Sequence, residues 1–462
     1  MADSSTDFDP LVDRAPARYV VGIDLGTTNS AVCYVDMQES PWQVRLLAIP
    51  QLVAANQVES RDTLPSFHFQ SPPQNLAKGS LRLPWYTDDQ DWCVGVMAQD
   101  EGVKSPGRLI ASAKSWLCHS GVDRAAKLLP WHGAADVDRL SPVDASGRYL
   151  GHIRDAWNAK FKKDALAEQD IVITLPASFD EVARELTVDA ASIAELPNVV
   201  LIEEPQAAFY AWVYKHDKEW PGLVSAGDTI LVCDIGGGTS DFTLIKVRKS
   251  DDEAASQRVQ FHRVAVGDHL ILGGDNLDIA LAHHLEAKLS GDGKLTPRQW
   301  DVLVRSCRRV KETLLGENAP EQATVNVPGS GTRLIGGGLQ TQVTREEVQE
   351  LLVDGFLPRT SISEMPVKGQ SGFREFGLPF ASDPAITRHL AAFLKAHGEV
   401  ANADNGNVSA AARPDVVLFN GGFFASPLLR ERSLEVLSNW FADQSQDNWQ
   451  PTVLDNDRLD LA

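Results

Sequence analysis

Two glycine-rich turns, each entered from a hydrophobic strand, constrain this chain more than any other feature of its sequence. They read Asp24-Leu25-Gly26-Thr27-Thr28-Asn29-Ser30 and Asp234-Ile235-Gly236-Gly237-Gly238-Thr239-Ser240-Asp241. Each turn is followed at once by another apolar strand, a pattern that is typical of a β-hairpin. The two leading aspartates stand 210 positions apart. This arrangement predicts an internal duplication at the scale of a domain, and therefore two similar lobes.

The residue types in these turns suit a phosphate group. Successive backbone N–H groups in a glycine turn form a concave array that holds anions, and threonine hydroxyls add donors. An aspartate at the end of the preceding strand can hold Mg²⁺, usually through water molecules. A single turn of this kind is as often structural as functional, because glycine turns are common in hairpins. Two related copies, each with its aspartate, predict a pair of opposed phosphate loops.

Composition and charge exclude several classes of protein. The 462 residues are 43% hydrophobic and 23% charged, as in soluble α/β domains. No stretch approaches the roughly 20 apolar residues that span a bilayer, and the polar, acidic start lacks a signal-peptide core. The formal charge of −20 argues against a nucleic-acid-binding surface. We therefore expect a cytoplasmic protein with a disordered N-terminal segment, residues 1–17.

The cysteines indicate a reducing environment. The five cysteines are an odd number, widely spaced and mostly within apolar runs. This favours buried, reduced thiols over disulfides or zinc ligands.

Helices alternate with strands between and after the two turns. The patterns predict strands at 170–174 and 199–202, and helices at 178–196, 205–213 and 296–315, with another helix beginning at Thr344. Ser178 to Glu181 and Thr296 to Gln299 have the capping-box pattern that starts a helix. Alternating strands and helices predict a mixed α/β fold with largely covered sheets.

The glycine turns resemble the two phosphate motifs of the 70-kDa heat-shock (DnaK-type) chaperone family, which belongs to the actin and hexokinase superfamily of ATPases. Further segments resemble the family in the expected order: Ile171 to Ala177 with Phe179 and Arg184, Glu203 to Ala208, Gly267 to Asn276, and Val416 to Gly422. The resemblance begins near Arg18, runs to the end, and is that of a divergent, bacterial-type member. It implies a two-lobed α/β fold of the actin/hexokinase type, each lobe with a mixed sheet flanked by helices around a duplicated RNase H-like core.

The resemblance also divides the chain. It implies lobe I at 18–226, with an inserted subdomain at about 62–145, and lobe II at 227–462, with an inserted subdomain at about 268–385. The family's peptide-binding domain and helical lid are expected beyond Ala462. We therefore expect a C-terminally truncated chain, which reaches client peptides only through a domain missing here.

The resemblance assigns nucleotide-binding roles to the turns and to the residues around them. Asp24, Glu204 and Asp234 would surround Mg²⁺, mainly through water. Thr27, Thr28, Gly236, Gly237 and Thr239 would hold the β- and γ-phosphates. The residues implied in binding ATP or ADP are Asp24, Gly26, Thr27, Thr28, Asn29, Gly236, Gly237, Gly238, Gly273, Gly274, Lys311, Gly421 and Gly422.

The implied catalytic residues are Lys114, Glu204, Asp234 and Thr239. Lys114, within Ala113 to Leu117, would orient the attacking water, because phosphoryl transfer depends mostly on positioning and charge neutralisation. The alternative for Lys114 is an ordinary surface lysine on a helix.

Two further residues, Pro176 and Arg184, resemble the family's relay between nucleotide and partner domain. The alternative is a structural role for both residues: Pro176 would stiffen its loop, and Arg184 would pair on the surface of a helix.

The adenine side departs from the family pattern, in which two arginines clamp the base and a serine hydrogen-bonds it. Glu312 and Leu315 stand where the first arginine and the serine are expected, and Ala425 lies in the segment that lacks the second arginine. Loss of a stacking partner costs about 0.5–2 kcal/mol. Phe423 or Phe424 could stack on the base instead, although burial in the core is the usual place for such a pair.

Three functions are therefore compatible with the sequence. The first is the slow ATPase domain of a DnaK-type chaperone, whose partners would be nucleotide, a J-domain co-chaperone and a nucleotide-exchange factor. The second is a sugar kinase or other small-molecule kinase, which needs a carboxylate base beside a substrate hydroxyl. The third is a nucleotide-binding scaffold, or pseudo-ATPase, without turnover. The Lys114 segment and the Glu204-Pro205 helix start favour the chaperone over the kinase.

Overall fold

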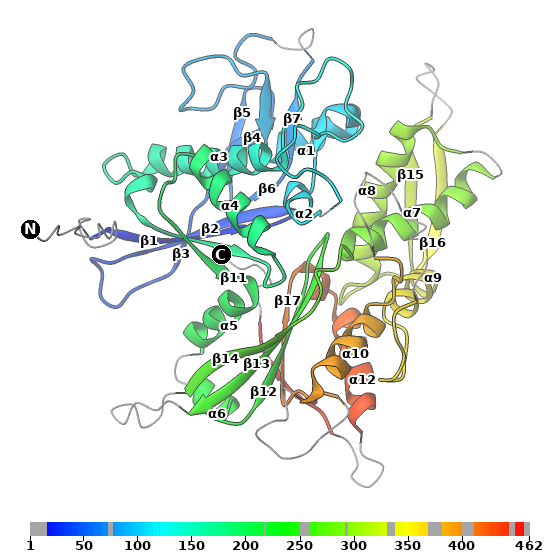
Figure 1. Cartoon of the computed structure of the whole chain (residues 1–462). Helices are drawn as coiled ribbons and strands as arrows, with labels where there is room; N and C mark the ends of the chain where they lie inside the picture. The colour runs from blue at the N-terminus through cyan, green and yellow to red at the C-terminus, as the bar shows by residue number, and fades with distance from the viewer. Residues whose placement is uncertain are drawn as a thin grey trace, which may run out of the picture.

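Two lobes, each built on its own β-sheet, make up the structure (Figure 1). The computed structural model describes residues 16–72, 77–119, 121–216, 219–249, 259–291, 294–329, 338–367, 381–399, 411–442 and 449–456. Most of the predicted disordered segment, residues 1–15, lies outside the described residues.

The first lobe contains a six-stranded sheet in the order β11-β10-β1-β2-β3, with β6 beside β2. The antiparallel pair β1–β2 confirms the first predicted hairpin, and β10 and β11 continue the sheet in parallel. Buried and partly buried residues alternate along β1, and its buried side chains pack in one core with those of α3 and α4. The elements are β1 (Tyr19–Leu25), β2 (Asn29–Asp36), β3 (Arg45–Leu46), β6 (Thr63–Pro65), β10 (Asp170–Leu175), β11 (Val199–Glu203), α3 (Pro142–Lys160), α4 (Glu181–Ile193), α5 (Glu204–Lys215) and α6 (Trp220–Leu223).

A smaller part of the first lobe lies above this sheet in Figure 1. It contains the hairpin β4–β5 and a three-stranded sheet in the order β8-β7-β9. Its elements are β4 (Ile49–Ala54), β5 (Gln57–Arg61), β7 (His68–Gln70), β8 (Trp92–Val94), β9 (Leu109–Ile110), α1 (Val96–Lys104) and α2 (Ala113–Leu117). Helix α1 contacts α8 of the second lobe, so the two lobes also meet away from their sheets.

The second lobe contains a five-stranded sheet in the order β14-β13-β12-β17-β18. The antiparallel pair β12–β13 confirms the second predicted hairpin. Every residue of β12 is buried, which is typical of a central strand covered on both faces. The strands are β12 (Thr229–Ile235), β13 (Ser240–Lys249), β14 (Val259–Val266), β17 (Val416–Asn420) and β18 (Thr452–Leu454).

The helices of the second lobe and the hairpin β15–β16 pack around a second core. The predicted capping box of α8 is confirmed, with Thr296 and Gln299 bonded reciprocally, and so is the one at Thr344. The elements are α7 (Gly274–Ser290), α8 (Pro297–Leu314), β15 (Gln322–Val327), β16 (Leu339–Thr344), α9 (Arg345–Val348), α10 (Ile386–Ala396) and α12 (Pro427–Phe441).

The predicted start of α4 was wrong. Asp180, not Ser178, caps the helix, accepting a hydrogen bond from the Ala183 N–H at 2.8 Å, and the helix ends at Ile193 rather than near 196. The Ser178 hydroxyl bonds Asp241 of the second lobe instead. A tertiary contact therefore takes the side chain that the local pattern assigned to a cap.

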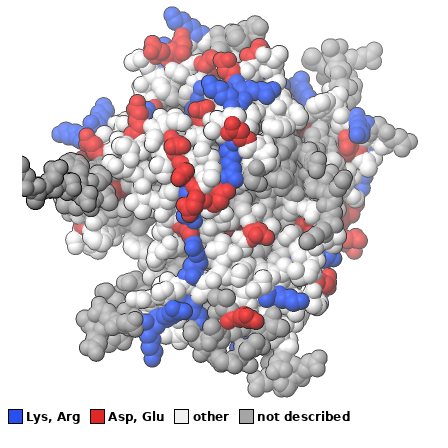
Figure 2. All heavy atoms as spheres, viewed as in Figure 1, with Lys and Arg blue, Asp and Glu red and all other residues white. Residues whose placement is uncertain are grey.

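Thiols and charges are distributed largely as expected. All five cysteines are free. On the face shown in Figure 2, Lys and Arg side chains lie in small separate groups beside acidic ones. No helix in the described part of the chain has the length and apolar character needed to cross a membrane.

Candidate functional site

The two glycine turns face each other across the junction of the lobes. A methyl group added at Gly237 would lie 2.5 Å from Thr28 Oγ1, and one added at Gly238 would lie 3.0 Å from Thr27 Cγ2. The hairpins therefore bring together turns that are 210 positions apart. Such close approach requires glycine at position 237, because any side chain there would push the turns apart.

The second turn is held by the start of α7 and by the end of β17. The Gly236 N–H donates to Thr239 O at 2.9 Å, which closes the turn, and the Gly274 N–H donates to Gly236 O at 3.0 Å. A Cβ at Gly273 would lie within 2.7 Å of Gly236 O. Gly421 has φ 86° and packs on the backbone of Ile235. The predicted residues Gly273, Gly274 and Gly421 thus surround the predicted turn.

Hydrogen bonds from one residue, Ser66, hold the first turn. Ser66 Oγ donates to Gly26 O at 2.7 Å, and the Ser66 N–H donates to Thr28 O at 2.8 Å. Asn29, also predicted to bind nucleotide, is exposed at the start of β2. Two carbonyls of the turn, those of Gly26 and Thr28, are therefore bonded within the protein.

Four charged residues meet beside the turns. Asp24 comes from β1, Lys114 from α2, Glu204 from the first residue of α5, and Asp234 from β12. The Lys114 ammonium pairs directly with the Glu204 carboxylate, and the two side chains are only 8% and 11% exposed. Thr174 Oγ1 donates to Asp24 Oδ1 at 3.2 Å. Lys114 is therefore not the surface lysine of the alternative interpretation.

Burial and mutual charge shift the pKa values of this cluster. Burial raises the pKa of Glu204, against the attraction of Lys114. Burial likewise raises the pKa of Asp234 well above its ordinary value, and the charges of Glu204 and Asp241 add to the effect. Burial lowers the pKa of Lys114, but Glu204 and Asp24 outweigh it and raise the value. The cluster thus has an excess of carboxyl groups in a site that disfavours their charged form.

A hydrated divalent cation fits this cluster. Asp234 Oδ2 and Thr28 Oγ1 are buried polar atoms without a hydrogen-bond partner among the described residues, and such atoms are costly unless a ligand satisfies them. In the described ranges, no three His, Cys, Asp or Glu side chains converge closely enough to coordinate a metal directly. Magnesium, which keeps much of its water, suits such a set better than a directly coordinated transition metal.

Comparison with known proteins identifies the family. The family described as "Hsp70 protein" matches residues 86–366. The chain belongs to the Hsp70 family. Among its relatives, the chaperone protein HscA of Salmonella paratyphi C (strain RKS4594) is 29% identical over 357 residues, which is 74% of this chain and 48% of the relative. HscA of Salmonella agona (strain SL483) is 30% identical over the same shares.

This Hsp70-family chain spans about half the length of the curated relatives that it matches. The two-lobed arrangement of its sheets is the actin-like fold of Hsp70 ATPase domains. The predicted fold class is thereby confirmed.

Three residues to which the sequence analysis assigned no role join the Hsp70-type site. Ser115 Oγ is buried without a partner among the described residues and points to the gap where a Cβ at Gly238 would lie 3.9 Å away. Asn420 lies opposite Asp234 in the β12–β17 pairing and lowers its pKa, and its side-chain oxygen accepts from Asn456 Nδ2 at 3.2 Å. Asp241 lies opposite Asp234 in the β12–β13 pairing. Ser115 and Asn420 could have been found from the sequence, because they stand next to Lys114 and Gly421.

The base side of the Hsp70-type site holds the three residues that depart from the family pattern, Glu312, Leu315 and Ala425. Leu315 is buried, and its carbonyl accepts from Ser426 Oγ at 2.8 Å, whereas Glu312 and Ala425 are exposed. Phe423 and Phe424 lie in the core of the second lobe. Of the two alternatives for this pair, the structure therefore shows burial in the core.

Two basic residues of α8, Lys311 and Arg308, pair with acidic residues of α7. Lys311 Nζ lies 2.6 Å from Asp278 Oδ1 and 2.8 Å from Gly274 O, at the edge of the second turn. Arg308 pairs with Asp275 and Asp278. Burial raises the pKa of Asp278, against the attraction of Lys311 and Arg308. Lys311, which the resemblance implies in nucleotide binding, therefore also ties α8 to the start of α7.

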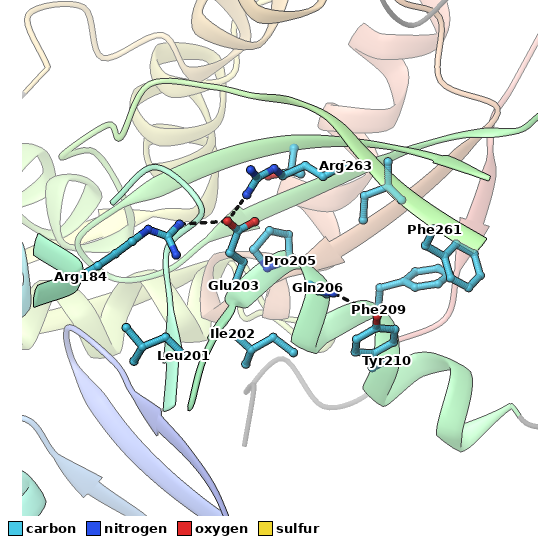
Figure 3. A pocket seen from close by; sticks show the side chains of 12 residues that line it. Arg184, Leu201, Ile202, Glu203, Pro205, Gln206, Phe209, Tyr210, Phe261 and Arg263 are labelled. Atoms are coloured by element: carbon cyan, nitrogen blue, oxygen red, sulfur yellow. Dashed lines mark hydrogen bonds and ion pairs between the residues drawn. The ribbon is translucent and has the colours of Figure 1, made fainter. Parts of the chain in front are cut away.

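A cavity of about 320 Å³ lies between the lobes, away from the turns (Figure 3). Glu203 points into it and is bonded by Arg184 of α4, at 2.9 Å, and by Arg263 of β14. Phe209 and Tyr210 of α5 form part of the wall. Because Glu203 directly precedes Glu204, this ion-pair network is joined by the backbone to the charged cluster.

Proposed function

We propose that this chain binds Mg-ATP between its lobes and hydrolyses it, as the ATPase part of a DnaK-type chaperone. The observation that carries the proposal is the buried cluster of Asp24, Lys114, Glu204 and Asp234 at the junction of two opposed glycine turns. Membership of the Hsp70 family and the name of the HscA relatives, chaperone proteins, support it. They leave the sugar-kinase alternative without support.

The residues divide the work of hydrolysis. Lys114, whose pKa is raised by Glu204 and Asp24 against the effect of burial, stays protonated at neutral pH and can orient water against the terminal phosphate. Glu204 holds the ammonium in place. Bound Mg²⁺ would neutralise phosphate charge, with Asp24, Glu204 and Asp234 holding its water shell.

The turns would supply the phosphate donors. Gly26, Thr27, Thr28, Gly236, Gly237, Gly238 and Thr239 are the proposed phosphate-binding set. The hydroxyl of Ser115 joins this set in our proposal, because its buried oxygen faces the turns without a partner among the described residues. Gly273, Gly274, Lys311, Gly421 and Gly422 are proposed to line the nucleoside side.

The decisive experiment is single-turnover hydrolysis of Mg-ATP by the parent and by Lys114→Ala and Glu204→Gln. Loss of one such preorganised group lowers the rate by about 10²–10³-fold in other enzymes. Lys163→Ala, at an exposed lysine, is the matched control and should keep the parent rate. A folded parent that binds ATP without hydrolysing it would instead support the nucleotide-binding scaffold.

We also propose a J-domain co-chaperone and a nucleotide-exchange factor as partners. The cavity at Glu203 supports a coupling role for Arg184, because its network is continuous with Glu204. Addition of a J-domain protein should raise the single-turnover rate of the parent, and Arg184→Ala should reduce that stimulation more than the basal rate. Equal stimulation of both proteins would contradict the role of Arg184.

A further inference from the structure

A second polar cluster joins the two lobes outside the proposed catalytic groups. The second lobe contributes Asp241 of β13 and His269, which lies between β14 and α7, and the first lobe contributes Ser178, between β10 and α4. His269 Nδ1 lies 3.1 Å from both Asp241 carboxylate oxygens and 2.9 Å from Ser178 Oγ. The Ser178 hydroxyl donates to Asp241. The His269 ring therefore lies beside the Ser178–Asp241 hydrogen bond that joins the two lobes.

A second neighbour of His269 from the first lobe is Cys118. It directly follows α2, the helix of Lys114. The Cys118 thiol lies beside His269 and raises the pKa of its ring, and the Cys118 sulfur lies 3.8 Å from Lys114 O. Lys114 and Cys118 are four residues apart and so share a face of α2. The Phe179 ring packs edge-on against His269 at 5.9 Å. Contact with His269 thus restrains the end of α2.

The backbone around His269 belongs firmly to the second lobe. Ser240 and Leu270 exchange two backbone hydrogen bonds of 2.9 and 3.2 Å, and the Gly267 N–H donates to Phe242 O at 2.8 Å. These bonds attach the segment of His269 to β13. When the lobes separate, His269 keeps Asp241 and loses Ser178 and Cys118.

We propose that His269 is a positioning residue that holds the lobes together and sets α2, with Lys114, against the phosphate turns. It does so by hydrogen-bonding Asp241 in its own lobe and Ser178 in the other, with Cys118 beside its ring. The effect on Lys114 rests on the proposed ATPase function, whereas the effect on lobe closure does not.

The electrostatics of His269 do not by themselves favour either lobe arrangement. Burial lowers the pKa of His269, but Asp241, and to a lesser degree Cys118, raise it well above its ordinary value of 6.5. Because Asp241 belongs to the same lobe as His269, its charge acts on the ring whether the lobes are closed or open. The contact that closure adds is the hydrogen bond with Ser178, 2.9 Å away.

The test measures lobe separation directly in the nucleotide-free chain. Two dyes are attached through non-natural side chains at exposed Gln57, on β5, and Glu321, beside β15, and their energy transfer reports the distance between the lobes. His269→Ala should lower the closed-to-open ratio at least about tenfold. Ser178→Ala should lie between His269→Ala and the native chain.

Two further variants serve as controls. His269→Gln retains a hydrogen-bond donor, so it should restore closure. His262→Ala removes an exposed histidine on β14 whose ring hydrogen-bonds Gln260, and it should keep the native lobe separation. Circular dichroism checks folding, and Ser178→Ala carries the test if His269→Ala does not fold.

Native lobe separation in both His269→Ala and Ser178→Ala would overturn the inference. Single-turnover hydrolysis then separates the two proposals. If the native chain does not hydrolyse ATP, the dye measurement still decides the role of His269. If it does, His269→Ala should hydrolyse about tenfold more slowly at pH 7 and His269→Gln should recover the rate; a native rate in His269→Ala would refute its effect on Lys114.

Discussion

The buried pair of Lys114 and Glu204 predicts a strong energetic coupling between α2 and α5. Lys114→Met removes the ammonium but not the bulk, and leaves the Glu204 carboxylate buried without the cation that now faces it. Breaking a buried ion pair from one side costs about 3–5 kcal/mol. Glu204→Gln should cost less, about 1–3 kcal/mol, because Asp24 and Asp234 still face Lys114. The double variant should cost clearly less than the sum, since neither charge of the pair remains.

The cost of Lys114→Met should also depend on pH. Burial already raises the pKa of Glu204, and loss of Lys114 removes the main attraction that opposes this rise. A carboxyl group whose pKa is raised on folding takes up a proton in the folded state, so stability falls as the pH rises above the unfolded value of about 4.3. The destabilisation should therefore be largest in alkaline buffer and smallest near about pH 5.

Urea unfolding followed by tryptophan fluorescence measures both effects. Trp116, on the same helix as Lys114, is buried and stacks on Trp131 at 5.0 Å, so it reports on this part of the first lobe. Coupling of about 2–3 kcal/mol is expected at about pH 8, with less at about pH 5. Additivity within about 0.5 kcal/mol at both pH values would refute the reasoning. Lys163→Met, at an exposed lysine, should change stability by no more than about 0.5 kcal/mol.

Three further predictions concern backbone geometry. Gly237→Ala places a methyl group 2.5 Å from Thr28 Oγ1 and should weaken Mg-ATP binding at least about tenfold by calorimetry; unchanged affinity would contradict the opposed turns. Gly151→Ala, within α3 where nothing lies within 4 Å of the new methyl group, should stabilise the chain by about 0.5–1 kcal/mol in urea unfolding, and a loss of stability would show hidden crowding. Thr296→Ala removes the cap of α8 and should cost about 1 kcal/mol, with Thr296→Ser close to native.

Local patterns predicted much of the fold. The two hairpins, the strands at 170–174 and 199–202 and the α8 capping box are all present. These features depend on residues near one another in the chain, so their sequence patterns suffice. The start of α4 escaped prediction because Ser178 found a partner in the other lobe, and a capping pattern holds no information about distant acceptors.

The candidate site was predicted as a set of residues, and its arrangement came from the tertiary structure. Asp24 and Asp234 could be selected because each precedes a glycine turn. The direct pairing of Lys114 with Glu204 and the orphaned hydroxyl of Ser115 could not, because they depend on how α2 packs against the second turn. The roles of these residues in hydrolysis stay predictions until the variants are measured.

The sequence by itself determined the two phosphate-type turns, the two lobes and the class of fold, because turn chemistry and strand patterns are written in contiguous residues. Only the tertiary structure decided which charges meet: Lys114 with Glu204, Lys311 with Asp278, and His269 with Asp241 and Ser178. The physical reason is that a buried charge depends on groups brought to it from distant segments. Those groups are chosen by the packing of the lobes, which no local pattern encodes.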